Sequence, residues 1–302
     1  MSRIAIAGAG AWGRALAFVA TEAGHDVRVW SRNGDARAVA DADALILAIP
    51  AQACREVLTI LSSAIPPGLP IIIAAKGIER SSGLLLNDVV AATVPKARAF
   101  VLSGPSFAAD VLRRLPTAVT LAAPTIDEAT RWATELTLPF FRVYASDDVL
   151  GVEIAGALKN VLAIAAGLSD GRGLGDSARA ALTARGFAEL TRFGRKLGAN
   201  PETMTGLSGL GDLLLTCSSR QSRNYAFGRA LGEGKTVAQA LAEASVVVEG
   251  AHTAAIAASL ARKHDVDMPI VMAVHAIIDA GANPDDEIAR LLARPVRAEI
   301  RD

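Results

Sequence analysis

The sequence predicts an α/β fold in which a mainly parallel sheet comes first and an all-α domain follows. Gly8, Gly10 and Gly13 stand between a strand-like run and a helix-like run, which is the setting of a dinucleotide-binding turn. Short Ile- and Val-rich runs then alternate with helix-like stretches as far as Tyr144, as expected of a parallel sheet covered on both faces. The N-terminal domain is therefore predicted to be Rossmann-like.

Seven short apolar runs are expected to form the sheet. They are Arg3–Ala7, Val27–Trp30, Ala44–Ile49, Ile71–Ala75, Ala99–Leu102, Ala118–Leu121 and Phe140–Tyr144. Ligands bind outside the carboxyl ends of parallel strands. Four sequence landmarks at such ends should therefore share one crevice, and these are the Gly8–Gly13 turn, Pro50, Lys76 and Ser103–Ser106.

Helical patterns alone follow the last strand. We therefore expect residues 1–145 to form the dinucleotide-binding domain and residues 146–302 an α-helical second domain. Ser146 is expected to cap a long helix. Asp176 is expected to cap a second helix that ends at Gly198.

Composition excludes several classes of protein. The 302 residues are 51% hydrophobic, and 31 basic residues balance 31 acidic ones, so nothing global attracts nucleic acid or an anionic membrane. Cys54 and Cys217 lie far apart and the histidines have no metal-ligand spacing, so neither a disulfide nor a metal site is expected. The most apolar helix candidate, Ile154–Leu168, is interrupted by Lys159 and too short to cross a bilayer, and no signal peptide is recognised. A cytoplasmic protein without membrane insertion is expected.

The second expected strand ends in Ser31 and Arg32. Folds that prefer NAD usually carry an acidic residue at this place to bind the ribose hydroxyls, whereas a cation favours the 2′-phosphate of NADP. An exposed arginine without a role is the alternative. NADP is therefore the expected cofactor, and NAD stays open.

Two lysines are candidates for the chemistry. Lys159 is the only charged residue between Ile154 and Ser169, and partial desolvation would lower its pKa toward a range useful for proton transfer. The alternative is a lysine that extends its ammonium group to water. Lys76 follows a strand end, where it can reach cofactor and substrate together or be solvated.

A polar stretch from residue 205 to residue 224 accompanies these lysines. Ser222, Arg223 and Asn224 supply hydrogen-bond donors and a fixed cation that suit a phosphate. Asp212 can orient a lysine or a hydroxyl. A solvated loop is the alternative interpretation.

Together these residues resemble the NAD(P)-dependent glycerol-3-phosphate dehydrogenases of the bacterial type. The resemblance covers nearly the whole chain. The strings that carry it are Gly-Ala-Gly-Ala-Trp-Gly (8–13), Trp-Ser-Arg (30–32), Lys-Gly-Ile-Glu (76–79), Leu-Ser-Gly-Pro-Ser-Phe-Ala (102–108), Gly-Val-Glu-Ile-Ala-Gly-Ala-Leu-Lys-Asn-Val (151–161), the 206–224 stretch and Val-Glu-Gly (248–250). It implies an oxidoreductase that interconverts dihydroxyacetone phosphate and sn-glycerol 3-phosphate for glycerophospholipid synthesis, with a C-terminal domain like that of 6-phosphogluconate dehydrogenase.

The resemblance also implies roles for individual residues. Lys159 would be the general acid/base, with Lys76 and Asp212 completing the catalytic set. Substrate-binding positions would be Lys76, Gly104, Ser106, Lys159, Asn160, Asp212, Thr216, Ser222, Arg223 and Asn224. Cofactor-binding positions would be Gly8, Gly10, Ala11, Trp12, Gly13, Arg32, Lys76, Ala108, Arg223 and Glu249.

The chain departs from the family in two places. A longer stretch with an edge strand normally follows the Trp-Ser-Arg string, whereas here a brief segment leads from Arg32 to Ala44, so the adenosine side of the pocket should be trimmed. Tyr225 stands where the family often has a basic residue.

Two other functions stay open at this point. A ketopantoate-type or 2-hydroxyacid-type reductase of the same fold would not need a phosphate clamp. A non-catalytic NADP-sensing module would need only the N-terminal site. The sequence does not fix the oligomeric state, and a homodimer stays open.

Overall fold

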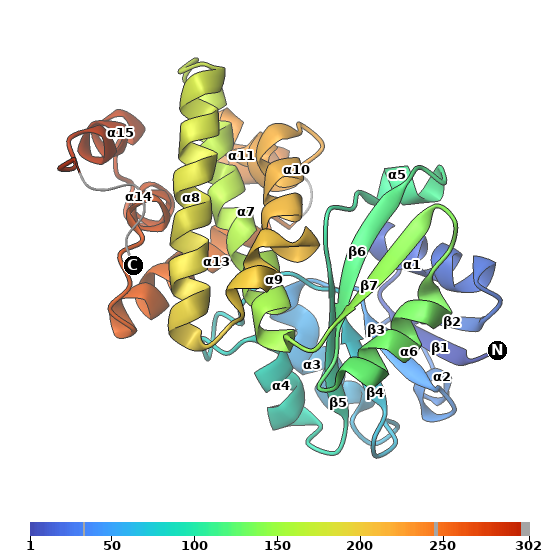
Figure 1. Ribbon diagram of the computed structural model, residues 1–302. Coiled ribbons are helices and arrows are strands. Elements are labelled where there is room, and N and C mark those ends of the chain that lie inside the picture. Colours follow the sequence, from blue (N-terminus) through green and yellow to red (C-terminus); the bar gives the residue numbers. More distant parts are fainter. Residues whose placement is uncertain (33, 245–246, 297–302) are drawn as a thin grey trace.

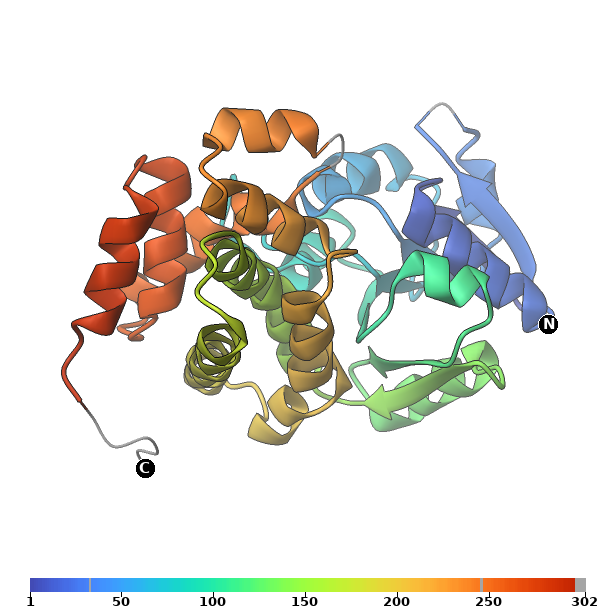
Figure 2. The same ribbon diagram turned by 90° about the horizontal axis from the view of Figure 1, so that it is seen from above.

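The computed structural model describes residues 1–32, 34–244 and 247–296. One half of the molecule is built around a sheet and the other half is helical, and the two halves lie side by side (Figure 1). The view from above shows the helical half as a layered bundle beside the sheet (Figure 2). The predicted fold class is confirmed.

All seven predicted strands are confirmed, with small shifts at their ends. They are β1 (Arg3–Ala7), β2 (Asp26–Trp30), β3 (Ala44–Leu47), β4 (Pro70–Ile73), β5 (Arg98–Ser103), β6 (Thr117–Ala122) and β7 (Phe141–Ser146). The strand order is β2-β1-β3-β4-β5-β6-β7, and every neighbouring pair is parallel except β5 and β6. The carboxyl ends of β1 to β5 therefore meet at one edge.

Helices cover both faces of this sheet. They are α1 (Ala11–Glu22), α2 (Arg37–Ala40), α3 (Cys54–Leu61), α4 (Leu86–Thr93), α5 (Ala108–Leu112) and α6 (Ile126–Leu136), with a 3₁₀ turn at Ala51–Ala53. Successive strand side chains point to opposite faces. Ile4 and Ile6 accordingly pack in the core with α1 and α6, whereas Ala5 and Ala7 pack in the core with α3 and α4.

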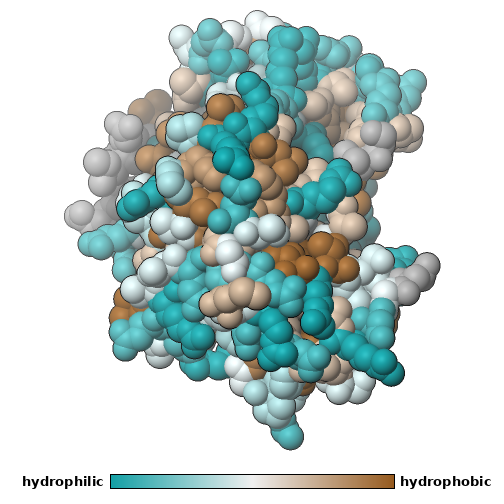
Figure 3. Space-filling view, turned by 90° about the vertical axis from the view of Figure 1, so that its right-hand side faces the viewer, coloured by the Kyte–Doolittle hydropathy of each residue, from teal (hydrophilic) through white to brown (hydrophobic). Residues whose placement is uncertain are grey.

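β2 is one of the two edge strands of the sheet. Its Arg28 and Val29 are exposed, while Trp30 is buried and its indole nitrogen donates to the Gly34 carbonyl at 3.0 Å. The short helix α2 then leads into β3. Hydrophilic and hydrophobic side chains are mixed on the face of the molecule at this end (Figure 3). The indole contact thus ties Gly34, in the short segment between Arg32 and Ala44, to the end of β2.

The helical half surrounds one long central helix. Its elements are α7 (Val149–Gly171), α8 (Asp176–Leu197), α9 (Pro201–Thr205), the π-helix η2 (Leu207–Gly211), α10 (Asp212–Ser218), α11 (Arg223–Gly232), α12 (Val237–Glu243), α13 (Glu249–Lys263), α14 (Pro269–Asp279) and α15 (Pro284–Leu292). Helices α8, α10, α11, α13 and α14 all pack against α7. Side chains on α7 therefore lie in the middle of this half.

The start and length of α7 differ from the prediction. Asp148, not Ser146, caps the helix, because its carboxylate accepts from the Gly151 N–H at 2.8 Å. The helix has 23 residues, so the apolar stretch Ile154–Leu168 is part of a longer helix that is long and apolar enough by composition to cross a membrane, and the expectation that it is too short is wrong. Of the residues in its most apolar stretch, 89% are buried inside the protein, so the neighbouring helices cover its apolar surface.

The start of α8 also corrects a prediction. Gly175, with φ of +87°, is the N-cap, and Asp176 is the first helical residue. The predicted end is confirmed, because Gly198 adopts a left-handed conformation with φ of +95°.

Glycines bring α7 and α11 into backbone contact. A Cβ atom at Gly167 would lie 2.0 Å from the Tyr225 carbonyl oxygen, and one at Gly228 would lie 2.0 Å from the Ile164 carbonyl oxygen. Neither position can carry a side chain without moving the backbone. This close crossing fixes the N-terminus of α11 against the central helix, and Tyr225 itself is buried there.

Candidate active site

The glycine turn after β1 has the form that a dinucleotide pyrophosphate needs. Gly8 has φ of +121°, and a Cβ there would lie 2.4 Å from the Ala48 carbonyl oxygen; one at Gly13 would lie 2.0 Å from the Gly8 carbonyl oxygen. Gly10, the N-cap of α1, has nothing within 4 Å of its missing Cβ. Gly8 and Gly13 thus serve backbone packing, while Gly10 leaves open surface at a helix N-terminus. The turn fits the pyrophosphate of a dinucleotide.

The other cofactor candidates in this half are spread along the same edge. Ala11 is exposed at the start of α1, while Trp12 and Ala108 are partly buried and pack against one core cluster, where α1 meets α5. Arg32 is exposed just after the outer strand β2, three strands away from β4. The structure therefore does not bring Arg32 into the cluster of the other charged candidates.

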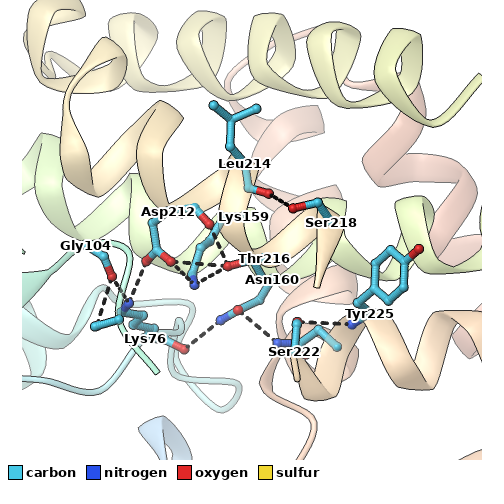
Figure 4. A network of polar contacts seen from close by, with 12 residues as sticks. Lys76, Gly104, Lys159, Asn160, Asp212, Leu214, Thr216, Ser218, Ser222 and Tyr225 are labelled. Carbon is cyan, nitrogen blue, oxygen red and sulfur yellow. Dashed lines mark hydrogen bonds and ion pairs between the residues drawn. The ribbon is translucent and has the colours of Figure 1, made fainter. Parts of the chain in front are cut away.

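A buried carboxylate joins the two lysines. Lys159 on α7 donates to Asp212 Oδ1 at 2.6 Å, and Lys76, which follows β4, donates to Asp212 Oδ2 at 2.5 Å (Figure 4). Only 8% of the Lys159 side chain and 2% of the Asp212 side chain are exposed. The alternative of a lysine that reaches water is therefore wrong for Lys159.

Burial sets the proton affinity of this centre. It lowers the pKa of Lys159 from its ordinary 10.5 to about 8, an effect that Asp212 opposes and Lys76 reinforces. Burial alone would raise the pKa of Asp212, but the charges of Lys159 and Lys76 hold it below its ordinary value. The predicted lowering of the Lys159 pKa is thus confirmed. The centre holds an ionised carboxylate and an ammonium that can give up a proton near neutral pH.

Thr216 and Gly104 complete the surroundings of the two ammonium groups. Lys159 also donates to Thr216 Oγ1 at 2.7 Å, and Lys76 donates to the Gly104 carbonyl at 3.1 Å. The hydroxyl of Ser106 donates to the same carbonyl at 3.1 Å. Gly104 and Ser106 therefore lie at the Lys76 side of the centre, at the end of β5.

Two asparagines extend the polar network toward α13. The Asn160 side chain donates to the Lys76 carbonyl at 3.4 Å (Figure 4). Its Oδ1 accepts from the Asn224 side chain at 2.9 Å, and Asn224 Oδ1 accepts from the Gly250 N–H at 2.9 Å. This chain of amides connects the loop after β4 with α7, α11 and α13. It places the start of α13, where Glu249 lies, beside the lysine centre.

Glu249 lies at the contact between the two halves. Its Oε1 accepts from the Ala51 N–H at 3.0 Å, while its Oε2 is buried and has no hydrogen-bond partner among the described residues. Burial raises the pKa of Glu249, and the Ala51 N–H and the charge of Arg223 oppose this effect. A buried acceptor without a donor suits a ligand N–H, such as a carboxamide.

The N-terminus of α11 offers a place for an anion. Ser222 is its N-cap and accepts from the Tyr225 N–H at 3.3 Å, and Arg223 is exposed on the first turn. Free N–H groups and the helix dipole favour negative charge at this end, and a guanidinium adds a bidentate donor. Phosphate is therefore a suitable ligand for this end of the helix.

Ser103, the first residue of the predicted Ser103–Ser106 landmark, is buried, and its hydroxyl has no hydrogen-bond partner among the described residues; it lies 2.8 Å from where a Cβ at Gly156 would be. One polar residue in the same region was missed from the sequence. Glu153 is buried on α7 and binds the backbone of α4. Glu153 gives no sequence signal, since an acidic residue on a helix is common in solvent-facing positions.

Known proteins with similar sequences and structures are glycerol-3-phosphate dehydrogenases. The chain is 49% identical over 328 positions to the glycerol-3-phosphate dehydrogenase [NAD(P)+] of Parvibaculum lavamentivorans, with 98% of each chain covered. It is 46% identical to that of Brucella ovis, with 99% of each covered. The crystal structure of glycerol-3-phosphate dehydrogenase from Coxiella burnetii superposes with a TM-score of 0.93 at 36% identity, covering 97% of this chain and 99% of that one. A ketopantoate reductase from Ralstonia eutropha, at 17% identity and a TM-score of 0.59, shares the fold alone.

Family models match both halves. The model for the N-terminus of NAD-dependent glycerol-3-phosphate dehydrogenase matches residues 3–37 and 34–129, and the model for its C-terminus matches residues 148–289. The two matches of the first model meet and overlap at residues 34–37, just after Arg32. The 328-position alignment exceeds the 302 residues of this chain, so the relative has additional positions. The segment that is shortened relative to the family therefore follows Arg32. These matches include most of the chain. It belongs to the NAD-dependent glycerol-3-phosphate dehydrogenase family.

Proposed function

We propose that this enzyme interconverts dihydroxyacetone phosphate and sn-glycerol 3-phosphate with NADPH as the usual reductant, and so supplies glycerophospholipid synthesis. One observation carries the proposal. Asp212 is held between the ammonium groups of Lys159 and Lys76, in the half that also presents Arg223 at a helix N-terminus. The two relatives described above bear the same activity in their names, which supports the substrate pair.

The buried centre supplies the proton chemistry of the reduction. A bound nicotinamide would supply the hydride, and the glycine turn and Glu249 are the groups that would hold it. Lys159 gives its proton to the oxygen of the reacting carbonyl group. Lys76 stabilises the negative charge that develops on that oxygen, and Asp212 keeps both ammonium groups in place.

Substrate phosphate would bind at the start of α11. The Ser222 hydroxyl accepts from the Tyr225 N–H and keeps its own hydrogen available as a donor. Arg223 supplies a bidentate cation and Asn224 a further N–H. Asn224 also contacts Asn160, the neighbour of Lys159, so binding of the phosphate and placement of the acid are linked through one hydrogen bond.

The pKa of Lys159 predicts opposite pH profiles for the two directions. Reduction needs protonated Lys159, so its kcat/KM should fall as the pH rises through about 8, whereas oxidation needs the neutral amine and should rise through the same range. Steady-state rates in both directions between pH 6 and 10, roughly the span around a group of this pKa, would test this. Profiles that change in the same sense in both directions would contradict the role of Lys159.

We propose NADP(H) as the preferred cofactor on the strength of Arg32. Arg32→Asp is expected to shift preference from NADPH toward NADH, because a carboxylate repels the 2′-phosphate and accepts from ribose hydroxyls. The dissociation constants of both cofactors measure this shift. Arg28→Asp is the matched control, since Arg28 is exposed like Arg32 but lies within β2, before the end of the strand. An unchanged ratio in Arg32→Asp would show that Arg32 is only a surface residue.

A comparison of substrates tests the proposed activity. Oxidation of NADPH, followed by its absorbance, should depend on dihydroxyacetone phosphate and be far slower with ketopantoate. Faster use of ketopantoate would favour the reductase alternative. Cofactor binding without turnover on either substrate would favour a sensing module.

We also propose the roles of the two domains, the location of the protein and its oligomeric state. Residues 1–145 would bind the nucleotide and residues 146–302 would supply the catalytic and phosphate-binding groups. The protein would be soluble in the cytoplasm and would form a homodimer. Light scattering of the purified protein tests the last point, and a monomeric mass would contradict it.

A further inference from the structure

Glu153 forms a contact between the two halves that the proposed reaction does not use. It is buried on α7, six residues before Lys159, and its Oε1 accepts from the Leu86 N–H at 2.6 Å and the Asn87 N–H at 3.1 Å. These N–H groups begin α4, whose own N-cap residue, Leu85, makes no side-chain cap. The carboxyl group therefore caps a helix that belongs to the other half of the molecule.

The contact joins the helix that carries Lys159 to the helix that follows the Lys76 loop. Lys76 lies in the loop between β4 and α4, while α7 carries Lys159. A single carboxylate, Asp212, accepts from both lysines at 2.5 and 2.6 Å, so a small shift of α7 relative to β4 would break one of these bonds. A cap that fixes α7 against α4 therefore bears directly on that geometry.

A close approach beside Glu153 makes the position of α7 sensitive to this cap. A Cβ at Gly156, one turn after Glu153, would lie 2.8 Å from Ser103 Oγ and 3.6 Å from the Lys76 side chain. α7 thus touches the end of β5 and Lys76 through a glycine, without a side chain that could interlock there. The glycine contact sets the distance of approach, and the cap at Glu153 resists sliding along the helix axis.

We propose that Glu153 is a positioning residue that, by capping α4 from α7, holds Lys159 in register with Lys76 so that both reach Asp212. Glu153 touches neither lysine and acts through its helix. The proposal rests on the proposed function only for the reaction used in the kinetic assay.

The chemistry of the contact predicts which substitutions it tolerates. Burial raises the pKa of Glu153 to about 8, an effect opposed by the N–H groups of Asn87 and Leu86. A neutral amide of the same shape presents the same kind of acceptor, so Glu153→Gln should keep the cap. Glu153→Asp withdraws the acceptor by one methylene, and Glu153→Ala removes it.

The chain supplies a matched control. Glu189 on α8 is also buried, and its two carboxylate oxygens accept from the Ile270 N–H at 2.8 Å and the Val271 N–H at 3.2 Å at the start of α14. This cap lies within the helical half and touches no element that carries Lys76. Glu189→Ala therefore removes the same kind of contact without crossing between the halves.

The test compares the four variants in thermal unfolding and in kinetics. We expect Glu153→Ala and Glu189→Ala to lower the unfolding midpoint by similar amounts. Glu153→Ala should lower kcat by ~10- to 100-fold, since misplacement of a catalytic group by about 1 Å can cost on the order of 100-fold. Glu189→Ala should keep kcat within ~2-fold of the wild-type value, and Glu153→Gln should have wild-type kcat. Glu153→Asp should have an intermediate kcat, and it still tests the proposal if the alanine variant does not fold. Equal losses of kcat in the two alanine variants, or wild-type kcat in Glu153→Asp and Glu153→Ala, would overturn the proposal.

A second measurement does not depend on the reaction. The pKa of Lys159, followed by NMR of labelled lysine, should move away from about 8 in Glu153→Asp, because a shift of α7 changes both the burial that lowers this pKa and the contact with Asp212 that raises it. It should not move in Glu189→Ala. If the wild-type protein does not reduce dihydroxyacetone phosphate but this pKa responds as expected, the proposed function fails and the positioning role stands. An unchanged pKa would count against the positioning role alone.

Discussion

Replacing Lys159 by alanine is expected to reduce turnover of dihydroxyacetone phosphate by at least ~10²-fold, the usual effect of losing a positioned acid. The Lys159 ammonium is buried against Asp212 and Thr216, so no solvated group stands ready to replace it. NADPH affinity should change little, because the glycine turn lies in the other half. Steady-state rates and a fluorescence titration with NADPH measure the two effects.

Two further variants separate lost chemistry from lost structure. Lys159→Met fills similar space and leaves Asp212 paired with Lys76, so this variant should fold while losing turnover to the same extent. Lys196→Ala, which removes an exposed lysine at the end of α8, should keep wild-type turnover. Near-native turnover in either variant of Lys159 would remove this residue from the mechanism.

Local patterns sufficed for most of the fold. Runs of Ile, Val and Ala mark the five inner strands, which are mostly buried because a parallel sheet leaves few positions there for polar residues. The edge strands β2 and β7 were also found, although both carry exposed residues. Strand ends were less certain, since they depend on pairing rather than on the run itself. The third run continues to Ile49, but β3 ends at Leu47, where its backbone pairing with β1 and β4 stops.

The start of α7 shows the same limit at a helix. Ser146 and Asp148 are both good N-cap residues two positions apart, and the sequence does not distinguish them. The structure selects Asp148 because β7 continues to Ser146 and leaves the turn to begin after it. The length of the preceding strand, a property of the sheet, thus decides where the helix begins.

The site was predictable only in part, because its contacts join distant residues. Lys159 could be recognised as a lone charge on an apolar helix, yet its bond to Asp212 spans 53 positions and the bond from Lys76 to Asp212 spans 136. Glu249 was placed by family resemblance alone. Glu153 and Glu189 were missed, since their partners are backbone N–H groups, which every sequence contains.

Replacing Arg223 by lysine is expected to lower kcat/KM for dihydroxyacetone phosphate by roughly 10- to 100-fold, although the charge is kept. A hydrogen bond between charged groups contributes about 1.5–3 kcal/mol, and an ammonium cannot bind phosphate in the bidentate way that a planar guanidinium does. Arg223 is exposed at the start of α11, so the substitution should not disturb the fold. Steady-state rates measure the loss, and Arg220→Lys, a nearby exposed arginine outside the helix, is the control.

Unphosphorylated dihydroxyacetone separates a phosphate clamp from other roles of Arg223. If the guanidinium binds substrate phosphate, the rate on this poorer substrate should fall by less than ~3-fold in Arg223→Lys. Dihydroxyacetone has no phosphate, so even the wild-type enzyme does not make this contact in its transition state. Arg223 also lies near enough to Glu249 to influence the pKa of that carboxyl group, which gives it a second route to the cofactor. Equal fractional losses on both substrates would favour that route. Selective loss on the phosphorylated ketone would assign the N-terminus of α11 to the phosphate.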